Sequence, residues 1–198
     1  EGASVVVVCV PVLSTAALLK SCRAHLAPGA LVTDVGSTKA EIVRAARAIL
    51  RRSSATFLGS HPIAGSEQQG LAAARADLYE RAVVVLTPVG GEPSGAAKRL
   101  ERFWTSVGAR TVRLPPRTHD RIMARTSHLP HLVAAALSVA VGRSPQPPGL
   151  RDFCGTGFRD TTRIAEGAPD IWMDILQSNR KAIAMEVRAF ERQVGLVA

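Results

Sequence analysis

The feature that most constrains the fold is the alternation of strand-like and helix-like segments through the first half of the chain. The opening run "SVVVVCVP" is continuous and β-branched, as in a strand buried on both faces of a parallel sheet. Further strand-like segments are "GALVTDVGS", "ATFLGS", "RAVVVLTP" and "RTVRLPP". Helix-like segments between them are "STAALLKSCRAHL", "KAEIVRAARAILRR" and "SGAAKRLERFWTSVGA", with a short helical piece around residues 70–79. This order predicts a mostly parallel α/β sheet with right-handed crossovers.

The pattern changes after Pro115 and Pro116. A helical pattern runs from Thr118 to Val141 with an interruption at Pro130, and two more helical segments follow the Pro/Gly-rich "RSPQPPGL". We therefore expect an α/β domain over residues 1–116 and an all-helical domain over residues 117–198. A parallel α/β half beside a helical half indicates a nucleotide-binding domain joined to a substrate-binding or dimerisation domain.

Composition and charge narrow the class of protein. The 198 residues, 46% of them hydrophobic, are enough to bury a substantial core. We expect neither a membrane span nor a signal peptide, because the apolar runs are short and no basic segment precedes the first strand. The formal net charge is +9, but the arginines are scattered and aromatics make up only 4%, which disfavours nucleic-acid binding. The three cysteines have no metal-ligand spacing and fit a reducing cytoplasm.

Ligands of open α/β sheets bind beyond the carboxyl ends of the strands, and polar residues follow three of the predicted strands. They are Pro11 to Ser14, Asp34 to Lys39 ("DVGSTK"), and Ser60 with His61. Pro62 biases His61 towards an extended conformation, and Gly65 permits a tight turn. An imidazole presented rigidly, with a pKa near neutrality, suits proton abstraction from a hydroxyl. A loop histidine that caps a neighbouring backbone group is the alternative interpretation.

Two clusters in the helical half carry further candidates. In "SHLPH", His128 and His131 are three positions apart, a spacing that suits either metal ligation or the wall of a polar pocket. In "GFRDTTR", Arg163 can grip a carboxylate while Asp160 orients it, although a surface ion pair is the ordinary explanation. A zinc hydrolase that uses His61 with the two histidines of "SHLPH" is a competing hypothesis.

Taken in order, the motifs resemble the prephenate/arogenate (cyclohexadienyl) dehydrogenase family over nearly the whole chain. The motifs are "VPV", "DVGSTK", "GSHPIAGSE", "RAVVVLTP", "FWTSVGA", "HDRIMARTSHLPH", "GFRDTTRIA" and "IWMDI". The resemblance implies a Rossmann-like domain that binds NAD or NADP, followed by a helical domain that forms a homodimer. It implies oxidative decarboxylation of prephenate to 4-hydroxyphenylpyruvate, or of arogenate to tyrosine, in tyrosine biosynthesis.

The resemblance also implies roles for individual residues. His61 is expected to accept the proton of the substrate's ring hydroxyl, with Ser37 beside that hydroxyl and the nicotinamide. His131 and Arg163 are expected to bind substrate, Arg163 through a carboxylate. Supporting, gating or pocket-lining positions are Glu67, Asp160, Trp172 and His128. Expected cofactor-binding positions are Val10, Pro11, Ser14, Asp34, Gly36 and Ser37, and no metal site is expected.

The chain departs from the family at its front. The resemblance implies a glycine-rich first βαβ unit ahead of the opening strand, whereas no G-x-G-x-x-G follows a strand near the start of this sequence. We therefore expect an incomplete Rossmann-like sheet, and the residue that selects NAD or NADP is expected in that unit. The alternative function is a catalytically incomplete fragment that acts only as a helical dimerisation module.

Overall fold

The first strands form from the β-branched runs and lie side by side in the computed structural model, which describes residues 2–65, 70–143 and 149–197. β1 (Val5–Val8) pairs in parallel with β2 (Leu31–Asp34), and β2 pairs in parallel with β3 (Thr56–Phe57). β5 (Val83–Thr87) pairs in parallel with β6 (Arg110–Arg113). The expected mostly parallel α/β sheet is confirmed.

The third predicted strand differs from the expectation. It continues past Leu58 into β4 (Gly59–Ile63), so His61 lies within a strand, opposite Val85, and not after its end. β4 runs antiparallel to β5, and with β6 these strands form a second three-stranded sheet, which continues the layer of β1, β2 and β3 where β4 contacts β2. A parallel pair needs a long crossover, usually helical, but the described part of the β4–β5 connection contains only the three-residue turn η3 (Leu71–Ala73). The helical piece expected around residues 70–79 was therefore wrong beyond that turn.

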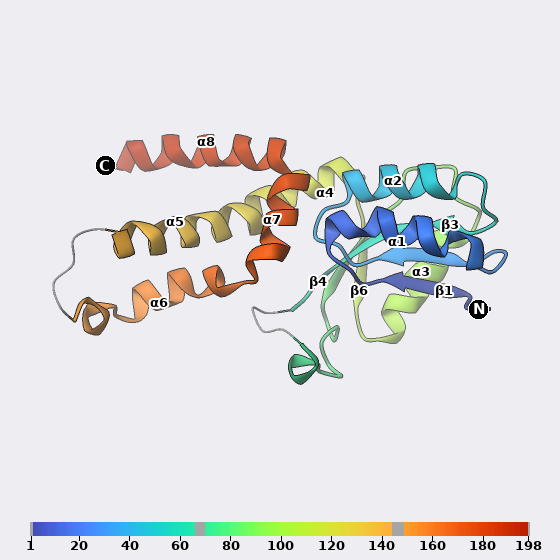
Figure 1. Cartoon of the computed structure of the whole chain (residues 1–198), viewed down its shortest axis with the longest axis horizontal. Helices are drawn as coiled ribbons and strands as arrows, with labels where there is room; N and C mark the ends of the chain where they lie inside the picture. Colours follow the sequence, from blue (N-terminus) through green and yellow to red (C-terminus); the bar gives the residue numbers. More distant parts are fainter. Residues whose placement is uncertain (1, 66–69, 144–148, 198) are drawn as a thin grey trace.

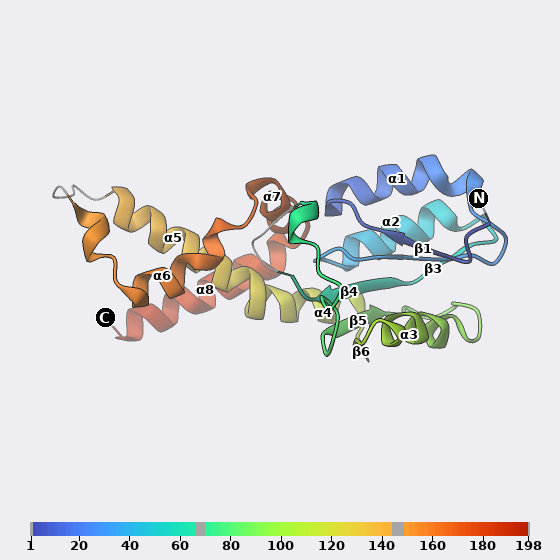
Figure 2. The same cartoon turned by 90° about the horizontal axis from the view of Figure 1, so that it is seen from below.

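Helices cover both faces of the sheet (Figures 1 and 2). α1 (Thr15–Cys22) and α2 (Ala40–Leu50) lie on one face, and α3 (Ala96–Ser106) lies on the other. Two short 3₁₀ turns flank α1, η1 (Val12–Ser14) and η2 (Arg23–His25).

Neighbouring residues of the same strand contribute to opposite layers of the core. Val32 packs with the α1/α2 layer, whereas Leu31 packs with the α3 layer around Trp104. Side chains of a strand alternate between its two faces, so the continuous apolar run fills both layers at once. This two-sided burial explains why the strands are continuous apolar runs in the sequence.

The second half is helical and extends away from the sheet (Figure 1). Its elements are α4 (Pro116–Met123), the π-helical turn η4 (Ala124–His128), α5 (Leu129–Arg143), η5 (Leu150–Phe153), α6 (Thr156–Thr162), η6 (Arg163–Glu166), α7 (Pro169–Ser178) and α8 (Arg180–Val197). The expected interruption at Pro130 takes the form of this π-helical turn, because a proline offers no N–H to a continuous helix. The division of the chain into two folding units at residue 116 stays a prediction.

None of the helices in the described ranges combines the length and the hydropathy needed to cross a membrane.

Candidate active site

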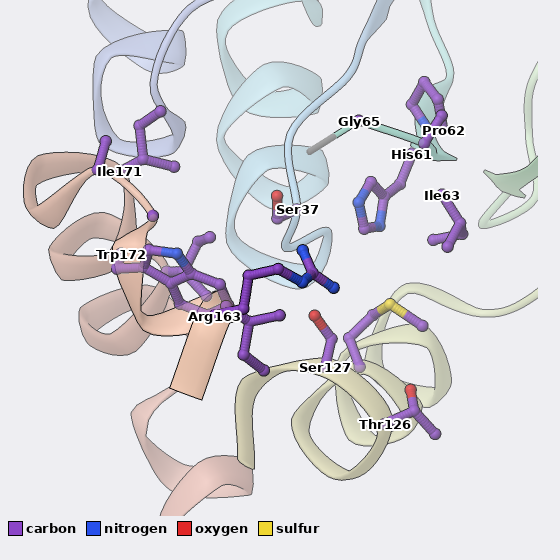
Figure 3. Close-up of a pocket in the computed structure, with 16 residues that line it drawn as sticks. Ser37, His61, Pro62, Ile63, Gly65, Thr126, Ser127, Arg163, Ile171 and Trp172 are labelled. Atoms are coloured by element: carbon purple, nitrogen blue, oxygen red, sulfur yellow. The ribbon is translucent and has the colours of Figure 1, made fainter. Parts of the chain in front are cut away.

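A cavity of about 660 Å³ opens where the carboxyl end of β2 meets the helical half. Ser37 enters it from the loop after β2, and His61 enters from β4. The helical half contributes Ser127 from η4, Arg163 from η6 and Trp172 from α7. Figure 3 shows the guanidinium of Arg163 pointing into the space between Ser37, Ser127 and His61. Residues from both halves therefore form one site.

His61 is held in place through the residue before it in β4. The hydroxyl of Ser60 bonds to the Asp34 carbonyl at 2.7 Å and accepts the indole N–H of Trp104 at 3.2 Å. On its own ring, the Nδ1 of His61 lies 2.8 Å from the Nε2 of His119. This contact occupies Nδ1, and Nε2 has no hydrogen-bond partner among the described residues, so Nε2 is the nitrogen that can meet a ligand.

The electrostatic surroundings keep His61 unprotonated at neutral pH. Burial is the main cause that holds the pKa of His61 well below its usual 6.5. The positive charge of Lys39 and the neighbouring rings of His119 and His128 lower that pKa further. A neutral imidazole beside the cavity can accept a proton.

A buried ion pair lies directly behind the site. The ammonium of Lys39 is 0% exposed, forms an ion pair with Asp34, and donates to the Ser60 carbonyl at 2.8 Å. Burial lowers the pKa of Lys39, while the attraction of Asp34 opposes that shift. Asp34 also accepts the N–H of Gly36 at 2.9 Å, so its carboxylate is committed within the protein. Its expected role towards a cofactor stays a prediction.

The other positions expected to bind cofactor lie on the turns after β1 and β2. Pro11 and Ser14 are exposed on the turn after β1, which a bond from the Leu13 N–H to Asp174 in α7 holds at 3.0 Å. Val10 in the same turn is partly buried against the core. At Gly36 an added Cβ would lie 2.6 Å from the Cδ1 of Ile42 and 2.9 Å from a carboxylate oxygen of Asp34, so any larger residue would force these side chains to shift. These turns lie at the carboxyl edge of the sheet, where open α/β sheets bind their ligands.

The structure separates the candidate substrate-binding residues into those at the cavity and those behind it. Arg163 and Trp172 line the cavity. His131 does not line it: its ring stacks on Trp172, with centroids 3.4 Å apart and planes at 8°. Burial lowers the pKa of His131, and a hydrogen bond with the Ile164 backbone opposes this shift. Gly167 is packed against the same indole, and an added Cβ would lie 2.4 Å from the Nε1 of Trp172.

Three further expected residues lie elsewhere. His128 is buried outside the cavity and its Nδ1 lies 3.2 Å from the Nδ2 of Asn179. Burial is the main cause that lowers the pKa of His128 to about 4. Asp160 is exposed on α6 and does not line the cavity. Glu67 falls outside the described residues.

Two residues next to the cavity, His119 and Asp120, were not predicted as site residues from the sequence, yet they contact His61 and the start of α2. The carboxylate of Asp120 accepts the backbone N–H of Lys39 at 2.7 Å and that of Ala40 at 2.9 Å. These N–H groups begin α2, and the Lys39 side chain does not cap them. No signal in the sequence pointed to this distant acceptor, because Ser37 and Thr38 stand just before α2 and look like ordinary local caps.

The histidines do not assemble into a metal centre. Within the described ranges, no group of three or more His, Cys, Asp or Glu residues could hold a metal ion. His61 contacts His119, whereas His128 contacts Asn179. The zinc hydrolase hypothesis therefore gains no support from the arrangement.

The chain matches known protein families and curated proteins along nearly its whole length. The nucleotide-binding domain of prephenate dehydrogenase matches residues 1–113, and the dimerization domain of prephenate dehydrogenase matches residues 115–197. Prephenate dehydrogenase of Bacillus subtilis is 37% identical over 199 residues, which cover 100% of this chain and 53% of that protein. Cyclohexadienyl dehydrogenase of Zymomonas mobilis is 32% identical, with 91% and 62% covered. The chain thus spans about half the length of curated relatives that it matches.

Solved structures agree with these matches. Prephenate dehydrogenase from A. aeolicus, in complex with hydroxyphenyl propionate and NAD+, superposes with a TM-score of 0.90 at 34% identity. That alignment covers 97% of this chain and 66% of the other. Arogenate dehydrogenase of Synechocystis gives a TM-score of 0.81 at 28% identity, with 98% and 70% covered. The resemblance read from the motifs is confirmed, and the chain belongs to the prephenate dehydrogenase family of oxidoreductases.

Proposed function

We propose that this chain carries out the oxidative decarboxylation of prephenate to 4-hydroxyphenylpyruvate, or of arogenate to tyrosine, in tyrosine biosynthesis. 4-Amino-4-deoxyprephenate is a close analogue that the same chemistry would accept. The hydride acceptor is NAD or NADP. The observation that carries the proposal is that an unprotonated histidine, His61, and a guanidinium, Arg163, face one cavity beside Ser37. The related A. aeolicus enzyme holds hydroxyphenyl propionate and NAD+ together, which supports this choice of ligands.

The residues around the cavity suit a substrate that carries two carboxylates and a ring hydroxyl. Arg163 provides a planar fork that pairs with a carboxylate through two N–H groups. Ser37 lies on the turn after β2, where its hydroxyl can contact both the substrate's hydroxyl and the cofactor. Trp172 forms an apolar wall for the substrate's ring, and the ring of His131 supports that wall from behind.

In the proposed reaction, His61 withdraws the proton of the ring hydroxyl through Nε2. The bound cofactor supplies one function, acceptance of hydride from the carbon that bears this hydroxyl. The ring carboxylate then leaves as CO2, its electron pair completes the aromatic ring, and the withdrawn proton returns to the phenolate oxygen. Aromatisation drives the loss of CO2, so the protein has to orient a dianion and hold one proton.

The helical half supports a homodimer in this proposal. Its family match is a dimerization domain, and α8 exposes a series of apolar side chains, among them Met185 and Leu196 at 63% and 79% exposure. Such a surface on a helical element is typical of an interface with a second copy. The three free cysteines fit a cytoplasmic enzyme.

The decisive experiment replaces His61. In the complete product of the gene, assayed with prephenate and arogenate and with both nicotinamide cofactors, His61→Asn should lower kcat by roughly two to four orders of magnitude. The matched control is His25→Asn at an exposed histidine remote from the cavity, which should leave kcat unchanged. Wild-type turnover in His61→Asn would show that His61 is not the base. A wild-type protein that dimerises but forms no NADH or NADPH with any of these substrates would favour the dimerisation-module alternative.

Arg163 is tested separately because its role lies in binding. Arg163→Ala should raise KM for prephenate by roughly 10- to 100-fold, because a charge-assisted bidentate pair is lost. Arg159→Ala, at an exposed arginine outside the cavity, is the control. An unchanged KM in Arg163→Ala would contradict the carboxylate role.

A further inference from the structure

Three ionisable side chains form a line that leads from the interior of the protein to the cavity. The Nδ1 of His61 lies 2.8 Å from the Nε2 of His119, and the Nδ1 of His119 lies 2.8 Å from an oxygen of Asp120. His119 is fully buried, so water does not replace either contact. Which group donates and which accepts in each of these two hydrogen bonds decides which ring nitrogen of His61 carries a hydrogen.

Asp120 sets that direction. One of its oxygens accepts the N–H of Lys39 and the other accepts the N–H of Ala40, and both groups belong to the first turn of α2. The backbone N–H groups can only donate, so the carboxylate acts as an acceptor on both sides. A further donor holds the backbone of the same residue, since the Nδ2 of Asn179 donates to the Asp120 carbonyl at 2.7 Å.

Because Asp120 is an acceptor, it fixes the tautomer of His119, and His119 in turn fixes the tautomer of His61. The Nδ1 of His119 has to carry the hydrogen that Asp120 accepts, and a neutral ring then has an unprotonated Nε2. That Nε2 faces the Nδ1 of His61, which must therefore be the donor in the second contact. The lone pair of His61 is left on Nε2, the nitrogen that the contact with His119 leaves free.

We propose that His119 and Asp120 are positioning residues that hold His61 in the Nδ1–H tautomer, so that its Nε2 can accept a proton from a ligand in the cavity. The inference rests on the proposed role of His61 as the base. When Nε2 takes the proton, the O–H bond of the ligand breaks and an N–H bond forms. The imidazolium keeps its Nδ1–H directed at His119, and no further proton has to move.

The same line also joins the two halves of the chain. His61 lies on β4 and Asp120 lies on α4, and Asp120 caps α2 across 81 positions of sequence. Within the described residues, the other charged or titratable groups that act on these rings are Lys39, from the start of α2, and His128, from η4. A shift of α4 relative to the sheet would therefore release His61 from its tautomer.

The test reads the tautomer directly. Protein labelled with [15N]histidine is examined by long-range 1H–15N NMR at about pH 8, above the ordinary pKa of imidazole near 6.5. His61→Asn assigns the signals. We expect the wild type to show a protonated Nδ1 and an unprotonated Nε2 at His61. An Nε2–H tautomer in the wild type would overturn the proposal, whatever the variants do.

Two variants at His119 complete the test. His119→Phe removes the acceptor, so His61 should shift towards the Nε2–H tautomer and kcat/KM should fall roughly 10- to 100-fold. His119→Gln keeps a carbonyl acceptor near the position of Nε2 and should retain the Nδ1–H tautomer and much of the activity. An unchanged tautomer and unchanged kcat/KM in His119→Phe would also overturn the proposal. If His119→Phe does not fold, the wild-type spectrum and His119→Gln still decide.

The outcome separates this inference from the proposed function. Full turnover in His61→Asn removes the base assignment, irrespective of tautomer. A strong loss of turnover in His61→Asn, combined with an Nε2–H tautomer in the wild type, removes only the role of His119 and Asp120.

Discussion

The two halves of the molecule bury their apolar side chains to different degrees. In the α/β half, two buried clusters sandwich the sheet, one under α1 and α2 and the other around Trp104 under α3. In the helical half, few apolar side chains beyond α4 are fully buried, among them Ala134, Ile175 and Ile183. Many of its larger apolar side chains are exposed instead, most of them on α7 and α8.

The difference shows what each half needs for stability. A sheet covered on both faces closes its own core, because alternate side chains of each strand enter different layers. A layer of a few helices leaves one face of α8 without a partner among the residues that the structure describes, and burial of apolar area provides most of the stability of such helices. The cavity lies between the two halves, so its geometry depends on how firmly each is held.

The two tryptophans offer the largest test of this comparison. Trp104→Ala, at a side chain 2% exposed in the α/β core, should lower the free energy of unfolding by roughly 3–5 kcal/mol. Trp172→Ala, at the cavity wall, should cost less stability and should mainly raise KM, because the ring contacts the ligand space and stacks on His131. Urea denaturation and steady-state kinetics on both variants measure the contrast. Equal losses of stability would mean that the halves do not differ as described.

Substitutions on the exposed apolar face of α8 should have a smaller effect, which is measured as weaker dimerisation. Phe190 and Val194 continue the helical stripe of buried Ile183 into solvent. Phe190→Glu combined with Val194→Glu should raise the dimer Kd about 100-fold or more, because charges at the centre of an apolar interface stay unpaired. Analytical ultracentrifugation at several concentrations measures this Kd, and Arg192→Glu on the opposite side of the helix is the control. Unaltered sedimentation of the double variant would place the interface elsewhere.

The smallest expected effect is a dependence of the free energy of unfolding on pH, caused by buried histidines near the junction of the two halves. His61, His128 and His131 have folded pKa values below the unfolded value of 6.5, so the unfolded chain binds protons more readily in acid. The free energy of unfolding should be at its full value above pH 6.5 and should fall as the pH drops below it. From the shift of His128 to about 4, that residue should contribute on the order of 1–2 kcal/mol of loss between pH 7 and pH 5. Urea titrations at these pH values should show a shallower loss in His128→Gln, and an equally steep loss would refute this assignment.

The elements of the fold were largely predictable because they depend on local patterns. The continuous apolar runs predicted β1, β2 and β5, and the amphipathic repeat after Lys39 predicted α2. The antiparallel direction of β4 was not predictable from the run "ATFLGS", because strand direction depends on the path of the connection that follows. The same error placed His61 after a strand when it lies within one.

The candidate site was predicted only where a motif lies at the cavity itself. Ser37, His61, Arg163 and Trp172 line the cavity, as the motifs led us to expect. His131 lies behind Trp172 with its ring stacked on the indole, and its expected role in binding substrate stays a prediction. The burial of the Lys39 charge was not predicted, because a lysine at the start of an amphipathic helix is ordinarily exposed.

The sequence by itself determined most of the order of strands and helices and, through its ordered motifs, the family, and it singled out His61 and Arg163 as candidates for proton abstraction and carboxylate binding. These follow from periodicity and from motifs, which are properties of short stretches of chain. Only the tertiary structure decided that Asp120 caps α2 and that His119 links it to His61. Such contacts join residues far apart in the sequence, and they form only when α4 has packed against α2 and β5.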